Sequence, residues 1–172
     1  MPPDAAPEVL AGALHVLHQP LAVALLAAVL LALRELPPRL AAASLAVLLA
    51  GAALTLLMRP AAWHQAFVAA CIALLGAVTA GALRLPRWMS IGSCAPAGVA
   101  LGLGSGVPLS SGGEVAGILL AAAVLLVALQ AAWRLASVRW LGHSMREWAP
   151  RVAGAWLAAI GSLVGALALL RA

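Results

Sequence analysis

Four side chains within or beside apolar stretches have the chemistry to bind a metal ion: His15, His18, His64 and Glu114. His15 and His18 are three positions apart, a spacing that places two imidazoles on one face of a helix. Neutral imidazole binds divalent nickel, zinc and copper, and a nearby carboxylate attracts such cations. The sequence therefore predicts a divalent-metal site from these four residues, provided that the fold brings them to one side of the molecule.

Each of these residues also has a structural interpretation, which the sequence leaves open. A histidine near a helix start commonly reaches the membrane interface or bonds a neighbouring backbone carbonyl, and His15 and His18 suit both roles. His64 follows a tryptophan and suits an interfacial position. Glu114 follows two glycines at the start of an apolar stretch, where a carboxylate interacts favourably with the helix dipole.

Gln130 is a further polar residue, deep in an apolar stretch. We expect it to hydrogen-bond between helices or to line a path through them. The sequence contains no Ser or Cys nucleophile beside a His base, no paired acids, no phosphate-binding loop and no paired-cysteine metal motif. We therefore expect no enzyme activity.

The elements that must position these residues are membrane helices. Of the 172 residues, 65% are hydrophobic and 9% are charged, whereas a soluble domain is about 45–50% apolar and about 25% charged. The polar side chains are too few to cover a water-facing globule, which excludes a soluble protein. The net charge of +5 comes from arginines scattered between apolar stretches, so we expect no nucleic-acid surface and one transmembrane domain over residues 1–172.

About 20 apolar residues cross the hydrocarbon core of a bilayer as a helix. This length predicts an all-α, polytopic bundle of about six transmembrane helices. The expected spans are 10–33, 40–58, 63–83, 88–109, 115–133 and 152–170. Charges and prolines separate them, and residues 134–151 form the longest polar stretch, which we expect to be a loop.

Arginine distribution predicts the orientation, because arginine is enriched in cytoplasmic loops. With six spans and both termini outside, eight of the ten arginines fall in inner loops, against Arg59 and Arg171 outside. The fourth span is rich in glycine, but omitting it would destroy this bias. The first ten residues carry no positive charge, which argues against a cleaved secretory signal. We therefore expect a multi-pass protein of the bacterial inner membrane.

Glycines spaced by four residues indicate where helices contact one another in lipid, because small residues let backbones approach closely. Such positions are Gly98, Gly102 and Gly106 in the fourth span, and Gly161 and Gly165 in the sixth. We expect both sets to lie at contacts between helices.

Several segments are similar to those of a known family. AGALH at residues 11–15, GALRLP at 81–86, LGLGSG at 101–106 and AGAWLAA at 153–159 follow its layout. In these segments the chain resembles the HupE/UreJ family, small membrane proteins that accompany hydrogenases and ureases and are regarded as nickel permeases. The resemblance implies transport of Ni²⁺ for hydrogenase or urease maturation, and His15 matches the first histidine of the family's first-span motif.

Other positions depart from the family pattern. The proline, aspartate and second histidine of the first-span motif fall on Val16, Leu21 and Ala22. In the later glycine-rich run the expected histidines fall on Leu101, Leu103 and Ser105, and a further one falls on Gln130. These departures leave an alternative open, in which the chain is a non-transporting accessory or scaffold subunit that has lost its metal ligands. In that case its partners are the lipid bilayer and a membrane protein or a second copy of itself.

Overall fold

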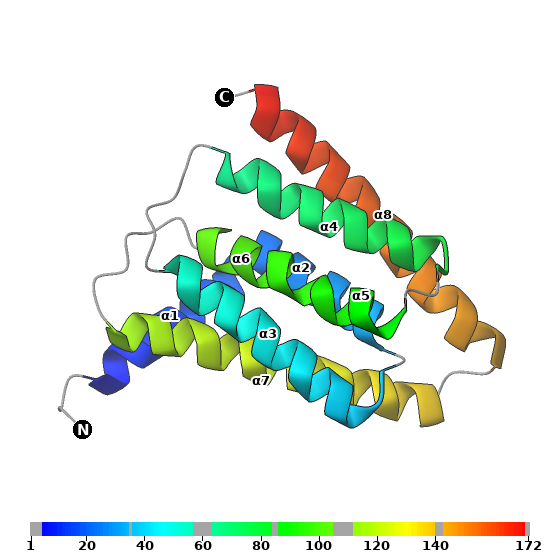
Figure 1. The fold of residues 1–172 in the computed structure, drawn as a ribbon, viewed down its shortest axis with the longest axis horizontal. Coiled ribbons are helices and arrows are strands. Elements are labelled where there is room, and N and C mark those ends of the chain that lie inside the picture. The colour runs from blue at the N-terminus through cyan, green and yellow to red at the C-terminus, as the bar shows by residue number, and fades with distance from the viewer. Residues whose placement is uncertain are drawn as a thin grey trace.

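The computed structural model describes residues 5–34, 36–56, 63–83, 86–104, 112–139 and 143–170, and every regular element in these ranges is an α-helix (Figure 1). The helices are α1 (Ala5–His18), α2 (Pro20–Leu33), α3 (Pro38–Leu56), α4 (His64–Ala80), α5 (Arg87–Gly92), α6 (Cys94–Gly104), α7 (Gly112–Arg139) and α8 (His143–Leu170). The expectation of an all-α fold is confirmed for the part of the chain that is described.

The helices run back and forth between two ends of the bundle. At one end α2, α4 and α7 finish and α3, α5 and α8 begin (Figure 1). At the opposite end α3 and α6 finish, and α4 and α7 begin. We call these the arginine end and the histidine end, because described arginines gather at the first and His64 opens α4 at the second.

Proline and a local capping motif define two helix boundaries at the arginine end. Pro38 begins α3, where its missing N–H is not needed and its fixed φ suits the first turn. The C-terminus of α4 is a Schellman motif, in which the N–H of Leu83 donates to the Val78 carbonyl and the N–H of Ala82 to the Thr79 carbonyl, both at 3.2 Å. Ala82 occupies the left-handed position of this motif, with φ of 50°.

Three helix pairs approach closely at glycines, and their contacts define relative directions. In α3 and α6, a Cβ on Gly51 would lie 2.9 Å from the Ala95 carbonyl oxygen, and the Thr55 hydroxyl donates to the Val99 carbonyl at 3.3 Å. A step of four residues along α3, from Gly51 to Thr55, corresponds to a step of four residues along α6, from Ala95 to Val99. The two helices are therefore parallel. Small residues at these points allow the two backbones to touch.

The other two pairs show the same kind of contact. In α1 and α7, Gly113 lies against Glu8 and Gly117 lies against Val9 and Ala13, so these helices are also parallel. In α4 and α8, Gly154 lies against Ala80, Gly161 against Ala73 and Gly165 against Ala69. The numbers rise in α8 as they fall in α4, so this pair is antiparallel.

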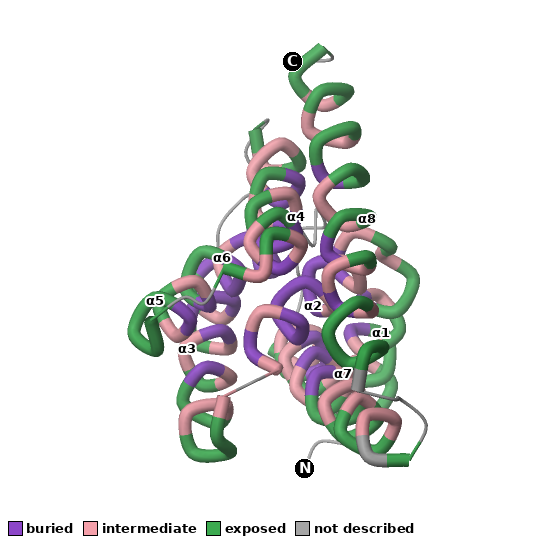
Figure 2. Tube along the Cα trace, turned by 90° about the vertical axis from the view of Figure 1, so that its right-hand side faces the viewer, coloured by how far each residue is buried: buried purple, intermediate pink, exposed green. Residues whose placement is uncertain are grey.

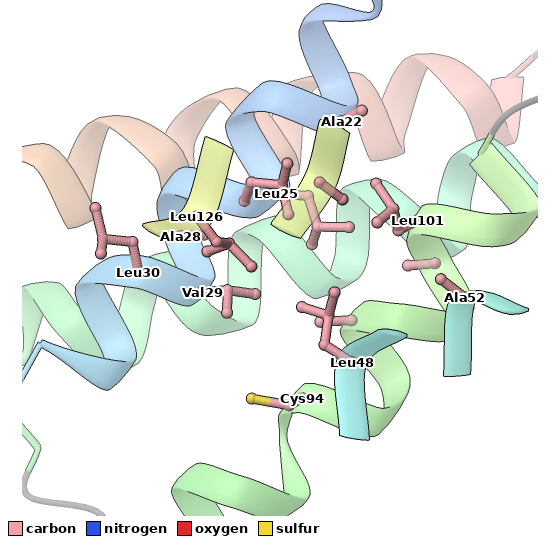
Figure 3. Packing of buried hydrophobic residues seen from close by; sticks show 14 of the residues in the cluster. Ala22, Leu25, Ala28, Val29, Leu30, Leu48, Ala52, Cys94, Leu101 and Leu126 are labelled. Atoms are coloured by element: carbon pink, nitrogen blue, oxygen red, sulfur yellow. The ribbon is translucent and has the colours of Figure 1, made fainter. Parts of the chain in front are cut away.

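Helix α2 lies at the centre of the bundle and contains much of its core. Its buried residues are Ala22, Leu25, Leu26, Ala28, Val29, Leu30, Leu31 and Leu33. Figure 2 shows this helix largely in the buried colour, with exposed residues on the outer faces of its neighbours. Leu25 and Val29 belong to one apolar cluster with Leu48 of α3, Leu101 of α6 and Leu126 of α7 (Figure 3).

Three described helices are long and apolar enough to cross a bilayer: α3, α7 and α8. Helices α1 and α2 together make a fourth if the bent pair is counted as one span. Only 11% of the apolar window of α8 is buried, and Leu163 and Leu170 are exposed. An apolar outer surface of this kind is stable in contact with lipid chains. The fold is that of a multi-pass membrane protein with three to four candidate spans.

The elements differ from the expected spans in three places. The expected continuous span 10–33 is broken into α1 and α2, which meet at 77°. The expected loop 134–151 is helical wherever it is described, because α7 continues to Arg139 and α8 starts at His143. The polar last turns of α7 and first turns of α8 continue the apolar parts of these helices at the arginine end. The expected fourth span, 88–109, is divided at Ser93 into α5 and α6, and its last five residues lie outside the described ranges.

Candidate functional site: the cavity at the bend between α1 and α2

The bend between α1 and α2 is built by Gln19 and Pro20. Gln19 has an extended backbone, with φ of −94° and ψ of 102°, between two helices. Pro20 has no N–H to continue the hydrogen bonding of α1, but its fixed φ suits the first turn of α2. The Gln19 carbonyl accepts from the N–H of Val23 at 3.2 Å, so it begins the hydrogen-bond ladder of α2. The break is therefore a consequence of the local sequence.

A cavity of about 220 Å³ lies at this bend, closed by the first turns of α4 and the end of α6. Its polar lining residues are Gln19, His64 and Gln65, and apolar residues such as Leu25 and Leu101 form the rest of the wall. The cavity is several times larger than the roughly 30 Å³ that one water occupies in the liquid. It can therefore admit a small polar solute or a partly hydrated cation next to an imidazole.

The structure places the four expected metal-site residues on three helices. His64 is half-buried at the start of α4 and lines the cavity. His15 and His18 are on α1, where His15 is half-buried and His18 is exposed, and neither lines the cavity. Glu114 is half-buried in the first turn of α7, and its backbone lies against Gly12 of α1. Thus His15, His18 and Glu114 belong to the α1–α7 pair, and His64 belongs to the cavity.

His18 is held by its own helix. Its Nδ1–H donates to the Leu14 carbonyl at 2.8 Å, and this bond leaves Nε2 as the nitrogen able to accept from a donor or bind a metal. Among the residues that the structure describes, no group of three or more His, Cys, Asp or Glu side chains is arranged to hold a metal ion. The cavity residue His64 is the imidazole that a solute inside the bundle would meet.

Gln130 lines a second cavity nearer the arginine end, of about 330 Å³, between α2, α3 and α7. The wall is mostly apolar, with Ser44 and Arg134 as its other polar residues. The Ser44 hydroxyl donates to the Leu40 carbonyl of its own helix at 2.9 Å. Gln130 therefore adds an amide to a largely apolar space beside the central helix.

Three of the five expected packing glycines have close neighbours on another helix. Gly98 of α6 lies against the Leu48 carbonyl of α3, and Gly161 and Gly165 lie against α4. Gly102 is buried in α6, and Gly106 falls outside the described residues.

The sequence analysis did not identify Gln19 and Gln65, which line the cavity, or Gly12 and Gly117, which lie at the contact between α1 and α7. A signal for the first pair is the Gln-Pro dipeptide inside an apolar run, because proline ends the hydrogen-bond ladder there. Gly117 follows Gly113 at the four-residue spacing typical of helix contacts, which is a signal for this end of α7, whereas Gly12 is isolated in the sequence.

Comparisons with protein-family models, with curated proteins and with solved structures find no match to this chain. The geometry of the chain itself therefore carries the functional argument.

Proposed function

We propose that the chain crosses the bacterial inner membrane six times, with both termini outside and the arginine end in the cytoplasm. Helix directions support this arrangement: six alternating crossings require the first and fifth to be parallel, the second and fourth parallel, and the third and sixth antiparallel. The pairs α1–α7, α3–α6 and α4–α8 have these relations. Arginine position supports it too, because cytoplasmic flanks of membrane helices are enriched in arginine. The described arginines are Arg34, Arg39, Arg87, Arg134, Arg139, Arg146 and Arg151.

This topology places the cavity at the bend inside the membrane. Helix α2 has 14 residues and is about 21 Å long at 1.5 Å per residue, whereas the hydrocarbon core is about 30 Å thick. If the last residue of α2, Leu33, lies at the cytoplasmic boundary, its first residue, Pro20, lies within the apolar layer. Non-helical backbone at that depth is tolerated where it is buried in protein or lines a water-filled cavity. Gln19 and the adjoining cavity meet this requirement.

Within this topology, we propose that the protein moves a divalent metal ion, nickel by its resemblance to HupE/UreJ proteins, from the outer face inward. One observation carries this proposal: His64 lines a cavity at a broken membrane helix. Discontinuous helices near the middle of the membrane form the solute sites of many transporters. A transported ion must also leave, so a site with few ligands suits passage better than a complete coordination shell. His15, His18 and Glu114 would attract the cation at the outer surface.

The alternative function is an accessory or scaffold subunit that does not transport. One observation favours it: in the described part of the chain, no set of three metal-binding side chains converges. Such a subunit would act through its outward apolar surface, and its cavity at the bend would have no role in passage. It would copurify with a membrane partner or a second copy of itself.

Nickel uptake by cells that express single-residue variants tests these functions against each other. We expect His64→Ala to lower the initial uptake rate at least tenfold, because it removes the imidazole from the cavity. Gln65→Ala should have a smaller effect, since an amide oxygen is a weaker nickel ligand. The matched control is His143→Ala, at a histidine that starts α8 at the arginine end and has no part in the proposed path. If cells that express the unsubstituted protein in their membrane take up nickel no faster than cells with an empty vector, the scaffold function is favoured.

A further inference from the structure

A cavity at the arginine end has a chemistry different from that at the bend. It measures about 410 Å³ and is lined by residues of α2, α4, α5 and α8 and the turns next to them. Its charged lining residues are Arg34, Arg87, Arg146, Arg151 and Glu147. Four guanidinium groups against one carboxylate give the described lining a formal charge of +3. No step of the proposed metal transfer uses this cavity, and its charge would repel a divalent cation.

Local contacts hold two of these arginines at the cavity. Arg34 caps the C-terminus of α2, and its Nη1 donates to the Leu31 carbonyl at 2.9 Å. This bond occupies one of the five N–H donors of a guanidinium group. The guanidinium carbon of Arg151 lies 5.9 Å from the ring centre of Trp148, within the range of a cation–π contact. These contacts reduce the conformational freedom that each arginine would lose on binding an anion.

The position of tryptophans indicates the depth of the cavity. Trp88, one residue after Arg87, and Trp148, one residue after Glu147, are 72% and 61% exposed. Exposed tryptophans gather in the headgroup layers of membranes, where the amphipathic ring is most stable. In the topology proposed above, the arginines of the cavity therefore lie at the level of lipid phosphates on the cytoplasmic side.

The rest of the cavity wall combines apolar and hydroxyl groups. Val78, Leu83 and Leu36 supply apolar surface, and Thr79 and Ser90 supply buried hydroxyls. A small inorganic anion would gain nothing from contact with the apolar part of the wall. A phospholipid has a phosphate for the guanidinium groups and a glycerol with the first acyl carbons for the apolar wall.

We propose that this cavity binds the phosphodiester headgroup of an anionic phospholipid of the inner leaflet. Arginine suits this role because its planar fork donates two parallel hydrogen bonds to phosphate oxygens. Basic cavities between membrane helices on the cytoplasmic side are known positions for anionic headgroups. A bound lipid would join α2, α5 and α8, which all contribute residues to this cavity.

Native mass spectrometry of the full chain in detergent tests the proposal. The probes are dioleoyl phosphatidylglycerol, dioleoyl phosphatidylcholine and inorganic phosphate, each added separately. We expect the unsubstituted protein to retain phosphatidylglycerol in preference to phosphatidylcholine. Arg87→Gln with Arg146→Gln should weaken phosphatidylglycerol binding by about 30-fold, which corresponds to about 1 kcal/mol for each arginine. Both side chains are exposed on the surface of the cavity, so we expect both substitutions to preserve the fold.

The matched control is Arg39→Gln with Arg139→Gln, which removes two exposed arginines from the same end but outside this cavity. We expect the control to bind phosphatidylglycerol as the unsubstituted protein does. Glu147→Gln should bind it several-fold more tightly, because a carboxylate is removed from the lining, and misfolding cannot produce that gain. Equal weakening by both double variants would mean attraction to overall charge and would overturn the assignment. Displacement of phosphatidylglycerol by millimolar inorganic phosphate would assign the cavity to a soluble phosphate ligand and overturn the proposal that it binds a lipid.

Discussion

The close packing of α8 against α4 gives a sharp prediction for Gly161→Ala. A Cβ at Gly161 would lie 2.5 Å from the backbone nitrogen of Ala73 and 2.7 Å from the carbonyl oxygen of Ala69. Ordinary contacts between heavy atoms are about 3.5–4.0 Å, so α4 and α8 would have to separate by about 1 Å. Neither neighbour can move aside, because both are backbone atoms of a helix. A separation of that size forfeits a quarter to a half of each dispersion contact along the interface.

We therefore expect Gly161→Ala to lower the free energy of unfolding by about 1–3 kcal/mol, the range for overpacked interiors. Titration of the protein from dodecyl maltoside into sodium dodecyl sulfate micelles, followed by helical circular dichroism, measures this change. The matched control is Gly165→Ala, where the Cβ would meet only the Ala69 methyl at an ordinary 3.5 Å. We expect the control to stay within about 0.5 kcal/mol of the unsubstituted protein.

A double variant tests the same reasoning further. Gly76 and Gly154 each lie against the backbone of the other, so one separation of α4 from α8 relieves both clashes. We expect Gly76→Ala and Gly154→Ala together to cost less than the sum of the single variants, a coupling that contacting residues commonly show. If Gly161→Ala and Gly165→Ala unfold alike, or if the double variant is strictly additive, the close approach of α4 and α8 is refuted.

Two other predictions concern single residues. Ala82→Gly should raise the free energy of unfolding by about 1 kcal/mol, because the φ of 50° at Ala82 costs an L residue about 1–2 kcal/mol. Thermal unfolding in detergent measures this gain, and a destabilised variant would contradict the capping geometry. Thr55→Val should cost about 0.6 kcal/mol, because its hydroxyl lies within hydrogen-bond distance of the Val99 carbonyl of another helix, at 3.3 Å, in addition to the Gly51 carbonyl of its own helix, at 3.0 Å. Thr79→Val is the control, since the Thr79 hydroxyl bonds Leu75 of its own helix, and equal losses would contradict an interhelical role for Thr55.

Much of the fold follows from the sequence for simple reasons. Apolar stretches separated by prolines and charges predict helices, and α3 and α4 lie close to the expected spans 40–58 and 63–83. The number of crossings is less accessible, because α2 and α4 are short and the apolar criterion of about 20 residues does not describe them. The helical form of residues 134–139 and 143–151 differs from the expected loop because polar composition is typical of loops. A helix that leaves the membrane keeps its hydrogen bonds and simply becomes polar.

The candidate site was only partly accessible from sequence. Histidines in an apolar chain are conspicuous, and one of the expected residues, His64, lines a cavity. Whether His15 and His18 could join it depended on the direction of α1, which the bend at Pro20 sets and the helical spacing of the two histidines does not reveal. The arginine cavity was hidden for a related reason, since its lining residues come from segments more than 100 positions apart.

The central claim is that the two ends of the bundle face opposite sides of the membrane, with the arginine end in the cytoplasm. Single cysteines at Trp63, Arg39 or Arg139, in a background with Cys71→Ala and Cys94→Ala, test it most directly, because all three positions are exposed. The account predicts that a membrane-impermeant maleimide labels position 63 in intact spheroplasts and labels positions 39 and 139 only after lysis. Labelling of position 139 in intact spheroplasts to the same extent as position 63 would contradict it.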